Sequence, residues 1–306
     1  MDKGPDEGEA GSLGVDAFSA NSRLVPDILK NKTNTDGVGP VPDEVILSKN
    51  TAPKKIPAVS LIFGPGLNRV RCYIPILKNL EREGVKIHIV SGSGLGAVLA
   101  SMYAMGLTPD KIEWQFHKFG RSAKDYAPYS KDWMELVDQI FLQQLKGKKI
   151  QNGVRRLILP IYNIKQNKTV YLSRGDLYWT LEQQLTLGQS LKKSNFMAPF
   201  HKEIYNLLEM RRMGADIVGG LDVLTNSVEF KNVDHFLLGT YGKAAAIAKK
   251  EIQNLGIYLT VDDNAPRLDS IDGMPEYLQR CNVSGAQFAT RMKDYVAKWG
   301  TEEKVE

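Results

Sequence analysis

The stretch Ile87-His-Ile-Val-Ser-Gly-Ser-Gly-Leu-Gly-Ala-Val-Leu-Ala100 decides the fold of this chain. Alternating β-branched and polar residues run into small residues and then into an Ala, Val and Leu segment, a pattern that predicts a strand, a tight turn and a helix. Ligands and nucleophiles usually lie at such a turn in an α/β sheet, because the helix N-terminus offers unpaired N–H groups to an anion. The residue at the centre of the turn therefore bears directly on function.

The turn contains a glycine frame that can be compared with the pattern G-x-S-x-G. Only Gly92 and Gly96 fit the outer glycines, and the residue between them, where a nucleophile would stand, is Gly94. Ser91 and Ser93 are close by but out of register. The sequence therefore predicts an elbow formed by Gly92, Ser93, Gly94, Leu95 and Gly96, without a nucleophile at its centre.

The segment before this turn predicts a β-α-β unit. Residues 58–63 have the pattern of a short apolar strand, and residues 64–69 (Gly64-Pro-Gly-Leu-Asn-Arg69) that of a turn-forming loop. A helix is expected from about Val70 to Gly84, where glycine can end it in a left-handed cap. The order β-α-β implies parallel strands joined by a right-handed crossover.

The rest of the chain predicts further helices and strands. Thr108 and Pro109 are expected to begin a helix that ends at Gly120, and Ser130 and Ser284 to begin two others. We expect helices over 97–105, over most of 176–213 and over 232–253, and strands over 156–162, 169–172, 215–223 and 256–261.

Composition indicates an ordinary globular protein. The chain has 306 residues, of which 42% are hydrophobic and 25% charged. Residues 1–55 are rich in Gly, Pro, Asp, Asn, Lys and Ser, and we expect a flexible leader there, one α/β domain over 56–300 and a polar tail over 301–306.

Charge and cysteine content narrow the function classes. The net charge of +5 is modest and its basic residues are spread out, so we expect no nucleic-acid partner. The chain has 2 cysteines, Cys72 and Cys281, too few for a disulfide framework and outside any metal spacing. We expect a soluble chain without a transmembrane segment, either cytoplasmic or from the cell envelope or periplasm if an export signal was removed.

Four motifs follow one another along the chain in an order that resembles the patatin-like phospholipase family. They are Gly64-x-Gly66-x-x-Arg69, Leu77-Lys-Asn-Leu-Glu-Arg-Glu-Gly84, Gly92-Ser-Gly-Leu-Gly-Ala97 and Met105-Gly-Leu-Thr-Pro109. The resemblance implies a three-layer α/β/α sandwich with a mostly parallel central sheet. It also implies an oxyanion loop made of Gly64, Pro65, Gly66, Leu67, Asn68 and Arg69.

Two departures from the family pattern bear on activity. The nucleophile position is Gly94, and the family's Asp-Gly motif, expected some 15 residues before Gly214, is missing. No Asp occurs from Leu177 to Ala215, and the corresponding region is Phe196-Met-Ala-Pro-Phe-His-Lys-Glu203. Residues 214–223 resemble the strand that follows the dyad Asp in bacterial members. We therefore expect a pseudoenzyme that binds a lipid, an acyl-like ligand or a protein partner through the old active-site cleft, or that serves as a scaffold, with peripheral membrane contact as one mode of action.

Two alternatives stay open. The first is an active lipid acyl hydrolase with Ser93 as a shifted nucleophile, in which His201 or Glu203 replaces the missing Asp. The second is a dinucleotide site, because Gly92-Ser-Gly94-Leu-Gly-Ala97 also satisfies G-x-G-x-x-[G/A]. Residues 107–120 predict a helix where that fingerprint needs a second strand, so we expect no cofactor. The four histidines show no metal spacing, and His88 is expected to be a hydrogen-bonded residue in or near the core.

Overall fold

The computed structural model describes residues 56–187, 194–224, 227–231, 234–261 and 264–299. The leader predicted over residues 1–55 and the tail predicted over 301–306 lie outside these ranges.

The core of the described structure is a mixed sheet of seven strands in the order β4-β3-β2-β1-β6-β7, with β5 paired to β3. The parallel part comprises β1 (Val59–Phe63), β2 (Ile89–Gly92), β6 (Ile217–Asp222) and β7 (Ile257–Thr260), together with the start of β3 (Arg156–Asn163). β4 (Lys168–Leu172) and β5 (Phe196–Met197) pair antiparallel with β3.

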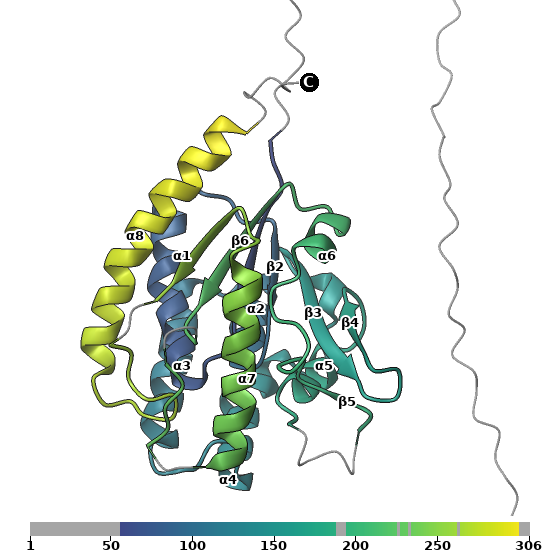
Figure 1. Ribbon diagram of the computed structural model, residues 1–306, viewed down its shortest axis with the longest axis vertical. Helices are drawn as coiled ribbons and strands as arrows, with labels where there is room; N and C mark the ends of the chain where they lie inside the picture. The colour runs from purple at the N-terminus through teal and green to yellow at the C-terminus, as the bar shows by residue number, and fades with distance from the viewer. Residues whose placement is uncertain (1–55, 188–193, 225–226, 232–233, 262–263, 300–306) are drawn as a thin grey trace, which may run out of the picture. The chain divides into compact units, whose positions relative to one another are not determined.

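Helices cover both faces of this sheet. Successive residues on a strand point to opposite faces. A Cβ placed on Gly219 would meet Phe288 and Met292 of α8 (Met274–Lys298), whereas one on Gly220 would meet Ile252 of α7 (His235–Ile252). The two helices therefore lie on opposite faces of β6, and Figure 1 shows α7 in front of the strands and α8 running beside α1. The predicted three-layer α/β fold is confirmed.

The remaining helices connect the strands. They are η1 (Leu67–Cys72), α1 (Tyr73–Arg82), α2 (Leu95–Ala104), α3 (Pro109–Ala123), α4 (Lys131–Val137), η2 (Asp138–Leu142), η3 (Gln143–Leu145), η4 (Ile150–Asn152), α5 (Leu177–Gln184) and α6 (Leu207–Arg212). Thr108 and Ser130 cap α3 and α4 as predicted, because their hydroxyls accept from the backbone N–H groups of Lys111 and Trp133. Gly84 has φ of 72°, the left-handed conformation expected after α1.

Three predictions about helices are wrong. The last helix begins at Met274 rather than at Ser284, since Gly273 adopts a left-handed conformation and Pro275 suits the first helical turn. The region 176–213 is helical only at its two ends, and Phe196–Met197 forms a strand against β3. Helix α3 also continues past Gly120 to Ala123.

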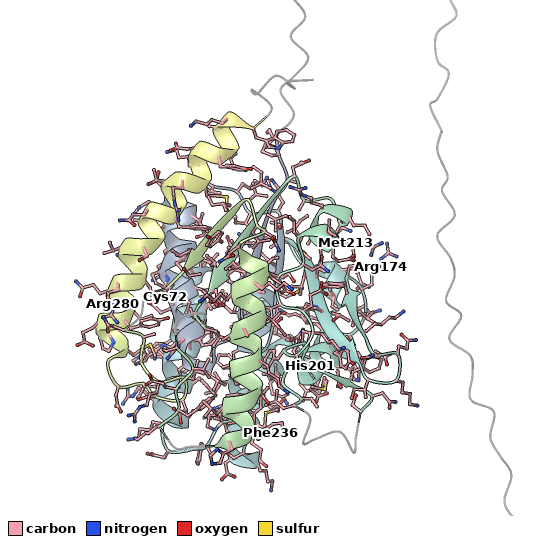
Figure 2. The ribbon with its side chains drawn as sticks, in the orientation of Figure 1. Cys72, Arg174, His201, Met213, Phe236 and Arg280 are labelled. Atoms are coloured by element: carbon pink, nitrogen blue, oxygen red, sulfur yellow. A yellow bond between two sulfur atoms is a disulfide. The ribbon has the colours of Figure 1, made fainter. Side chains whose placement is uncertain are left out.

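The two cysteines are joined across the chain. A disulfide links Cys72, at the end of η1, to Cys281 on α8, and both are fully buried. The cysteine count gave no sign of this pairing. Figure 2 labels Cys72 between α1 and α8, so the bond ties the segment after the first glycine loop to the last helix.

Candidate functional site

The turn between β2 and α2 has the backbone geometry of a nucleophile elbow. Gly94 has φ of 59° and ψ of −131°, a conformation that residues with a side chain adopt only under strain. A Cβ on Gly92 would lie 2.6 Å from the Gly96 carbonyl oxygen, so the turn is too tight for any side chain there. The glycines are therefore required by the shape of the elbow.

The predicted oxyanion loop lies directly against this elbow. A Cβ on Gly96 would come within 2.4 Å of the Gly64 carbonyl oxygen, and one on Gly94 would lie 3.7 Å from the Pro65 side chain. The Ser93 N–H donates to the Phe63 carbonyl oxygen at 3.1 Å. The structure thus brings together residues 63–65 and 92–96, which are separated by a helix in the sequence.

An aromatic side chain occupies the space above the centre of the elbow. A Cβ on Gly94 would be 2.8 Å from the Phe200 ring, and Phe200 is 1% exposed. The ring packs against Tyr241 at 5.4 Å between centroids, and Tyr241 contacts Phe230 and shares a 2.7 Å hydrogen bond with Tyr129. We call Phe200, Tyr241, Phe230 and Tyr129 the aromatic plug. Within this plug, the Phe200 ring occupies the volume into which a side chain at position 94 would project.

A buried amide completes the elbow. The Gly94 N–H donates to the Gln184 Oε1 atom at 3.0 Å, and Gln184 in turn donates from its Nε2 atom to the Pro160 carbonyl oxygen. Gln184 is fully buried at the end of α5. This partner was missed in the sequence, because nothing in a lone glutamine 90 positions away indicates contact with a glycine.

Ser93 points into the protein. The side chain is fully buried, and its Oγ atom has no hydrogen-bond partner among the described residues. A serine nucleophile needs a neighbouring base to accept its proton and a path to the substrate. Ser93 makes no hydrogen bond to such a base among the described residues, and its burial separates it from a substrate, which weighs against the alternative of a shifted nucleophile.

Arg69, at the end of the glycine loop, is buried rather than exposed on the surface. The guanidinium donates to the carbonyl oxygens of Pro266 at 2.5 Å, Ser227 at 2.6 Å and Val223 at 3.2 Å, and also to the Ser227 hydroxyl. Burial lowers the pKa of Arg69, although the charges of Tyr277, Glu229 and Asp222 oppose the shift. Arg69 therefore holds two loops together, and its donors point at backbone carbonyls instead of at an anion.

A buried carboxylate lies at the end of β6. Asp222 is fully buried and accepts hydrogen bonds from the Tyr205 hydroxyl and the Leu224 N–H, both at 3.1 Å. The Tyr205 hydroxyl also donates to the Leu221 carbonyl oxygen, and it lies where a Cβ on Gly64 would project. Burial, and then the charge of Asp222, raises the pKa of Tyr205 well above its ordinary value. This network supports the wall of the glycine loop.

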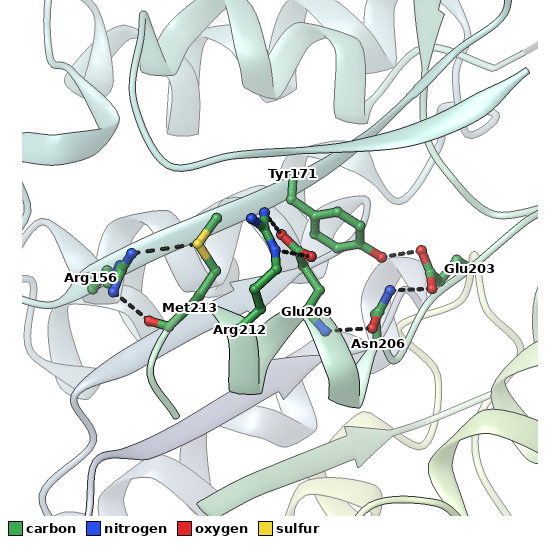
Figure 3. Close-up of polar contacts among 7 residues, drawn as sticks. All are labelled: Arg156, Tyr171, Glu203, Asn206, Glu209, Arg212 and Met213. Atoms are coloured by element: carbon green, nitrogen blue, oxygen red, sulfur yellow. Dashed lines mark hydrogen bonds and ion pairs between the residues drawn. The ribbon is translucent and has the colours of Figure 1, made fainter. Parts of the chain in front are cut away.

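The side chains of His201 and Glu203 contact residues outside the elbow. His201 packs edge-on against the Tyr162 ring at 4.3 Å, and its pKa is lowered by burial and then by two neighbouring lysines. Glu203 accepts hydrogen bonds from the Tyr171 hydroxyl and from the Asn206 amide (Figure 3), and burial raises its pKa. Neither side chain is hydrogen-bonded to residues 92–96.

Other kinds of site find little support in the described residues. They contain no group of three or more His, Cys, Asp or Glu side chains that could hold a metal ion, and no helix among them is long and apolar enough to cross a membrane. His88 accepts a hydrogen bond at Nδ1 from the Val59 N–H at 3.1 Å, which confirms its expected place near the core.

Comparison with known proteins supports the resemblance. Residues 61–200 match the family model for patatin-like phospholipase. Lysophospholipase nte1 of Emericella nidulans is 22% identical over 186 residues, which are 54% of this chain and 12% of that protein. Patatin-like phospholipase domain-containing protein 6 of Homo sapiens is 22% identical over 199 residues, or 60% of this chain and 14% of that protein. The chain therefore spans a small part of the curated relatives that it matches.

Solved structures give weaker likenesses. VipD from Legionella pneumophila is 10% identical with a TM-score of 0.45, covering 79% of this chain and 67% of that chain. The type III effector protein ExoU is 10% identical with a TM-score of 0.41, covering 78% of this chain and 53% of that chain.

Proposed function

We propose that this chain, which carries a patatin-like phospholipase domain over residues 61–200, acts by binding and does not hydrolyse lipid esters. The observation that carries the proposal is Gly94 at the centre of the elbow with Phe200 packed over it. Acyl transfer requires a nucleophile, a base that activates it and donors that stabilise the oxyanion. Glycine has no side-chain nucleophile, and the Phe200 ring lies where a side chain at this position would project.

The contacts of the neighbouring acid and base candidates support the same proposal. Residues 177–215 contain no Asp, and His201 and Glu203 are engaged with Tyr162, Tyr171 and Asn206. Removing the nucleophile of a comparable triad hydrolase lowers turnover by about a millionfold. A residual rate of that size would not sustain a lipid-hydrolysing function.

The packing of Phe200 over the elbow bears on where a ligand or partner would bind. Among the surface cavities of the described residues, five of 260–790 Å³ are lined neither by residues 92–96 nor by the glycine loop at 64–69. We therefore favour binding of a lipid, an acyl-like ligand or a protein partner at another surface, with the domain retained as a scaffold.

Fluorophosphonate labelling of the pure protein, followed by intact mass and peptide mapping, tests the proposal. The reagent reacts with an activated serine without any knowledge of the substrate. We expect no adduct on the chain, while a patatin-type hydrolase treated alongside is labelled. Ser93→Ala is the matched variant. An adduct on Ser93 of the wild type that is absent from this variant would instead establish a hydrolase with a shifted nucleophile.

A further inference from the structure

One of these cavities lies between α3 and the start of α8. It measures about 610 Å³, and we call it the α3–α8 groove. Its walls include Arg71, Trp114, Ile271, Met274 and Leu278. Small-molecule sites typically measure about 300–1,000 Å³, are largely apolar and carry a few polar groups that fix orientation. The groove fits this description and belongs to no part of the elbow.

Arg71 is the unusual group in this groove. It is half-buried, and its guanidinium makes no hydrogen bond or ion pair with the part of the chain that the structure describes. Burial lowers the pKa of Arg71, while the charge of Glu113 opposes the shift. Gly120 leaves room for the guanidinium, since a Cβ there would lie 3.1 Å from its Nη1 atom. Leaving a cation partly desolvated and unpaired is unfavourable, and an anion in the groove would relieve this cost.

Two acidic residues, Asp110 and Glu113, also line the groove, and both contact the same lysine. Lys78 contacts the carboxylates of Asp110 at 2.7 Å and Glu113 at 2.8 Å. Arg121 adds a second guanidinium at the edge of the groove, where it is exposed. Lys78, Arg71 and Arg121 carry three positive charges against the two carboxylates, which leaves one positive charge in excess at the groove.

The rest of the groove is apolar and aromatic. Met274 is buried, Ile271 and Leu278 are half-buried, and Trp114 is 61% exposed and stacks on His117 at 6.0 Å between centroids. An exposed Trp beside aliphatic side chains provides a large contact surface for an apolar chain. The Cys72–Cys281 disulfide joins the residue after Arg71 to α8, one turn beyond Leu278, so the segment that carries Arg71 is covalently linked to α8.

We propose that the α3–α8 groove binds a single-chain lipid with an anionic head group. The head group pairs with Arg71, and the acyl chain lies along Met274, Leu278 and Trp114. A cation at one end of an apolar trough matches the charge distribution of such an amphiphile. The site is separate from the elbow, so it does not depend on whether the chain hydrolyses esters.

The test is a titration of the full chain with oleate below its micellar concentration, followed by Trp fluorescence. Oleyl alcohol supplies the chain without the charge, and acetate the charge without the chain. We expect saturable binding of oleate, and binding of oleyl alcohol and acetate weaker by at least about tenfold, the size of one charge-assisted hydrogen bond. Trp114→Phe should abolish the fluorescence change, whereas Trp179→Phe should retain it.

Arg71→Gln is the decisive variant. Arg174→Gln removes the same charge elsewhere on the surface and is its control. Arg174 is exposed beyond β4 on the other side of the view in Figure 2. Arg71→Gln should weaken oleate binding at least about tenfold, and Arg174→Gln should leave it unchanged. Leu278→Glu places a carboxylate in the groove at a half-exposed position and should also abolish oleate binding. This variant replaces Arg71→Gln as the test if Arg71→Gln fails to fold. No saturable binding of oleate, equal binding of oleyl alcohol, or unchanged affinity in the groove variants would each overturn the proposal.

Discussion

At the scale of single residues, Gly94 and Phe200 depend on each other. The φ of 59° at position 94 is strained for any residue with a Cβ, and Phe200 closes the volume that the Cβ would enter. A glycine at this position removes both sources of strain. The glycine at position 94 and the packing of a ring above it therefore stabilise the same local structure.

We predict that Gly94→Ser lowers the free energy of unfolding by about 2–4 kcal/mol, from backbone strain of about 1–3 kcal/mol and overpacking against Phe200. Urea unfolding measures the change. Gly84→Ser is the control for backbone strain alone, because Gly84 has φ of 72° and nothing within 4 Å of an added Cβ. We expect a smaller loss there.

A double-mutant cycle with Phe200→Ala isolates the contact between the ring and position 94. Gly94→Ser should cost less in the Phe200→Ala background than in the wild type, since the ring is gone. If the cost of Gly94→Ser is the same in both backgrounds, Phe200 does not restrict the elbow.

His88 gives the second residue-scale prediction. Burial, and then the charge of Lys86, lowers the pKa of His88, and its Nδ1 atom must be unprotonated to accept from the Val59 N–H. Because the folded pKa lies below the ordinary value of 6.5, protonation favours the unfolded state. Stability should therefore fall as the pH drops below about 6.5 and level off below the folded pKa.

Urea unfolding between pH 7.5 and pH 5 measures this dependence. His88→Asn should show a smaller loss of stability over this interval, whereas replacing the exposed His117 by Asn should preserve the wild-type loss. An identical pH profile for His88→Asn and the wild type would contradict the assigned cause.

At the scale of elements, Arg69 connects the glycine loop to the segments that follow β6 and β7. Its three carbonyl acceptors belong to residues 223, 227 and 266, and the Asn68 N–H adds a hydrogen bond to the Leu268 carbonyl oxygen at 3.1 Å. Arg69 is thus a structural clamp between these segments. The loop keeps its shape because these backbone groups are satisfied.

We predict that Arg69→Met destabilises the protein by about 2–4 kcal/mol, because buried carbonyl oxygens lose their donors. Hydrogen exchange at the Asn68 and Leu268 amides should accelerate more than in the central strands. Arg71→Gln, two residues away, is the matched control and should not destabilise the chain, since Arg71 has no described hydrogen bond to lose. Equal stability of Arg69→Met and the wild type would exclude the clamp.

The disulfide gives a second prediction for the elements. Cys72 and Cys281 are separated by 209 residues, so the bond restricts a long loop in the unfolded chain. Disulfides typically contribute about 2–4 kcal/mol. Replacing both cysteines by Ser should lower the free energy of unfolding by about this amount, and reduction of the wild type should give the same shift. Two titratable thiols in the unreduced, unfolded protein would show that the bond is absent.

At the scale of the whole molecule, local patterns predicted most of the fold. The β-α-β unit, the caps at Thr108 and Ser130 and the strand over 215–223 follow from short-range rules, and the structure confirms them. The start of α8 was missed, although Pro275 was a usable signal. Phe200, Gln184 and Arg69 could not be assigned from sequence, because their partners lie 90 or more positions away or depend on which way a loop folds back.

Whether activity can be restored also depends on contacts between distant parts of the molecule. Gly94→Ser supplies a hydroxyl in the elbow but no base, since residues 177–215 lack Asp and His201 and Glu203 have other contacts. Gly94→Ser/Phe200→Ala also removes the ring above it and still adds no base. We therefore expect neither variant to hydrolyse 4-nitrophenyl butyrate above the wild-type rate, with folding checked by circular dichroism. Hydrolysis by the double variant alone would mean that the aromatic plug was the remaining obstacle, whereas hydrolysis by Gly94→Ser alone would mean that another group already acts as the base. Either result would make the elbow a site that one or two substitutions can reactivate.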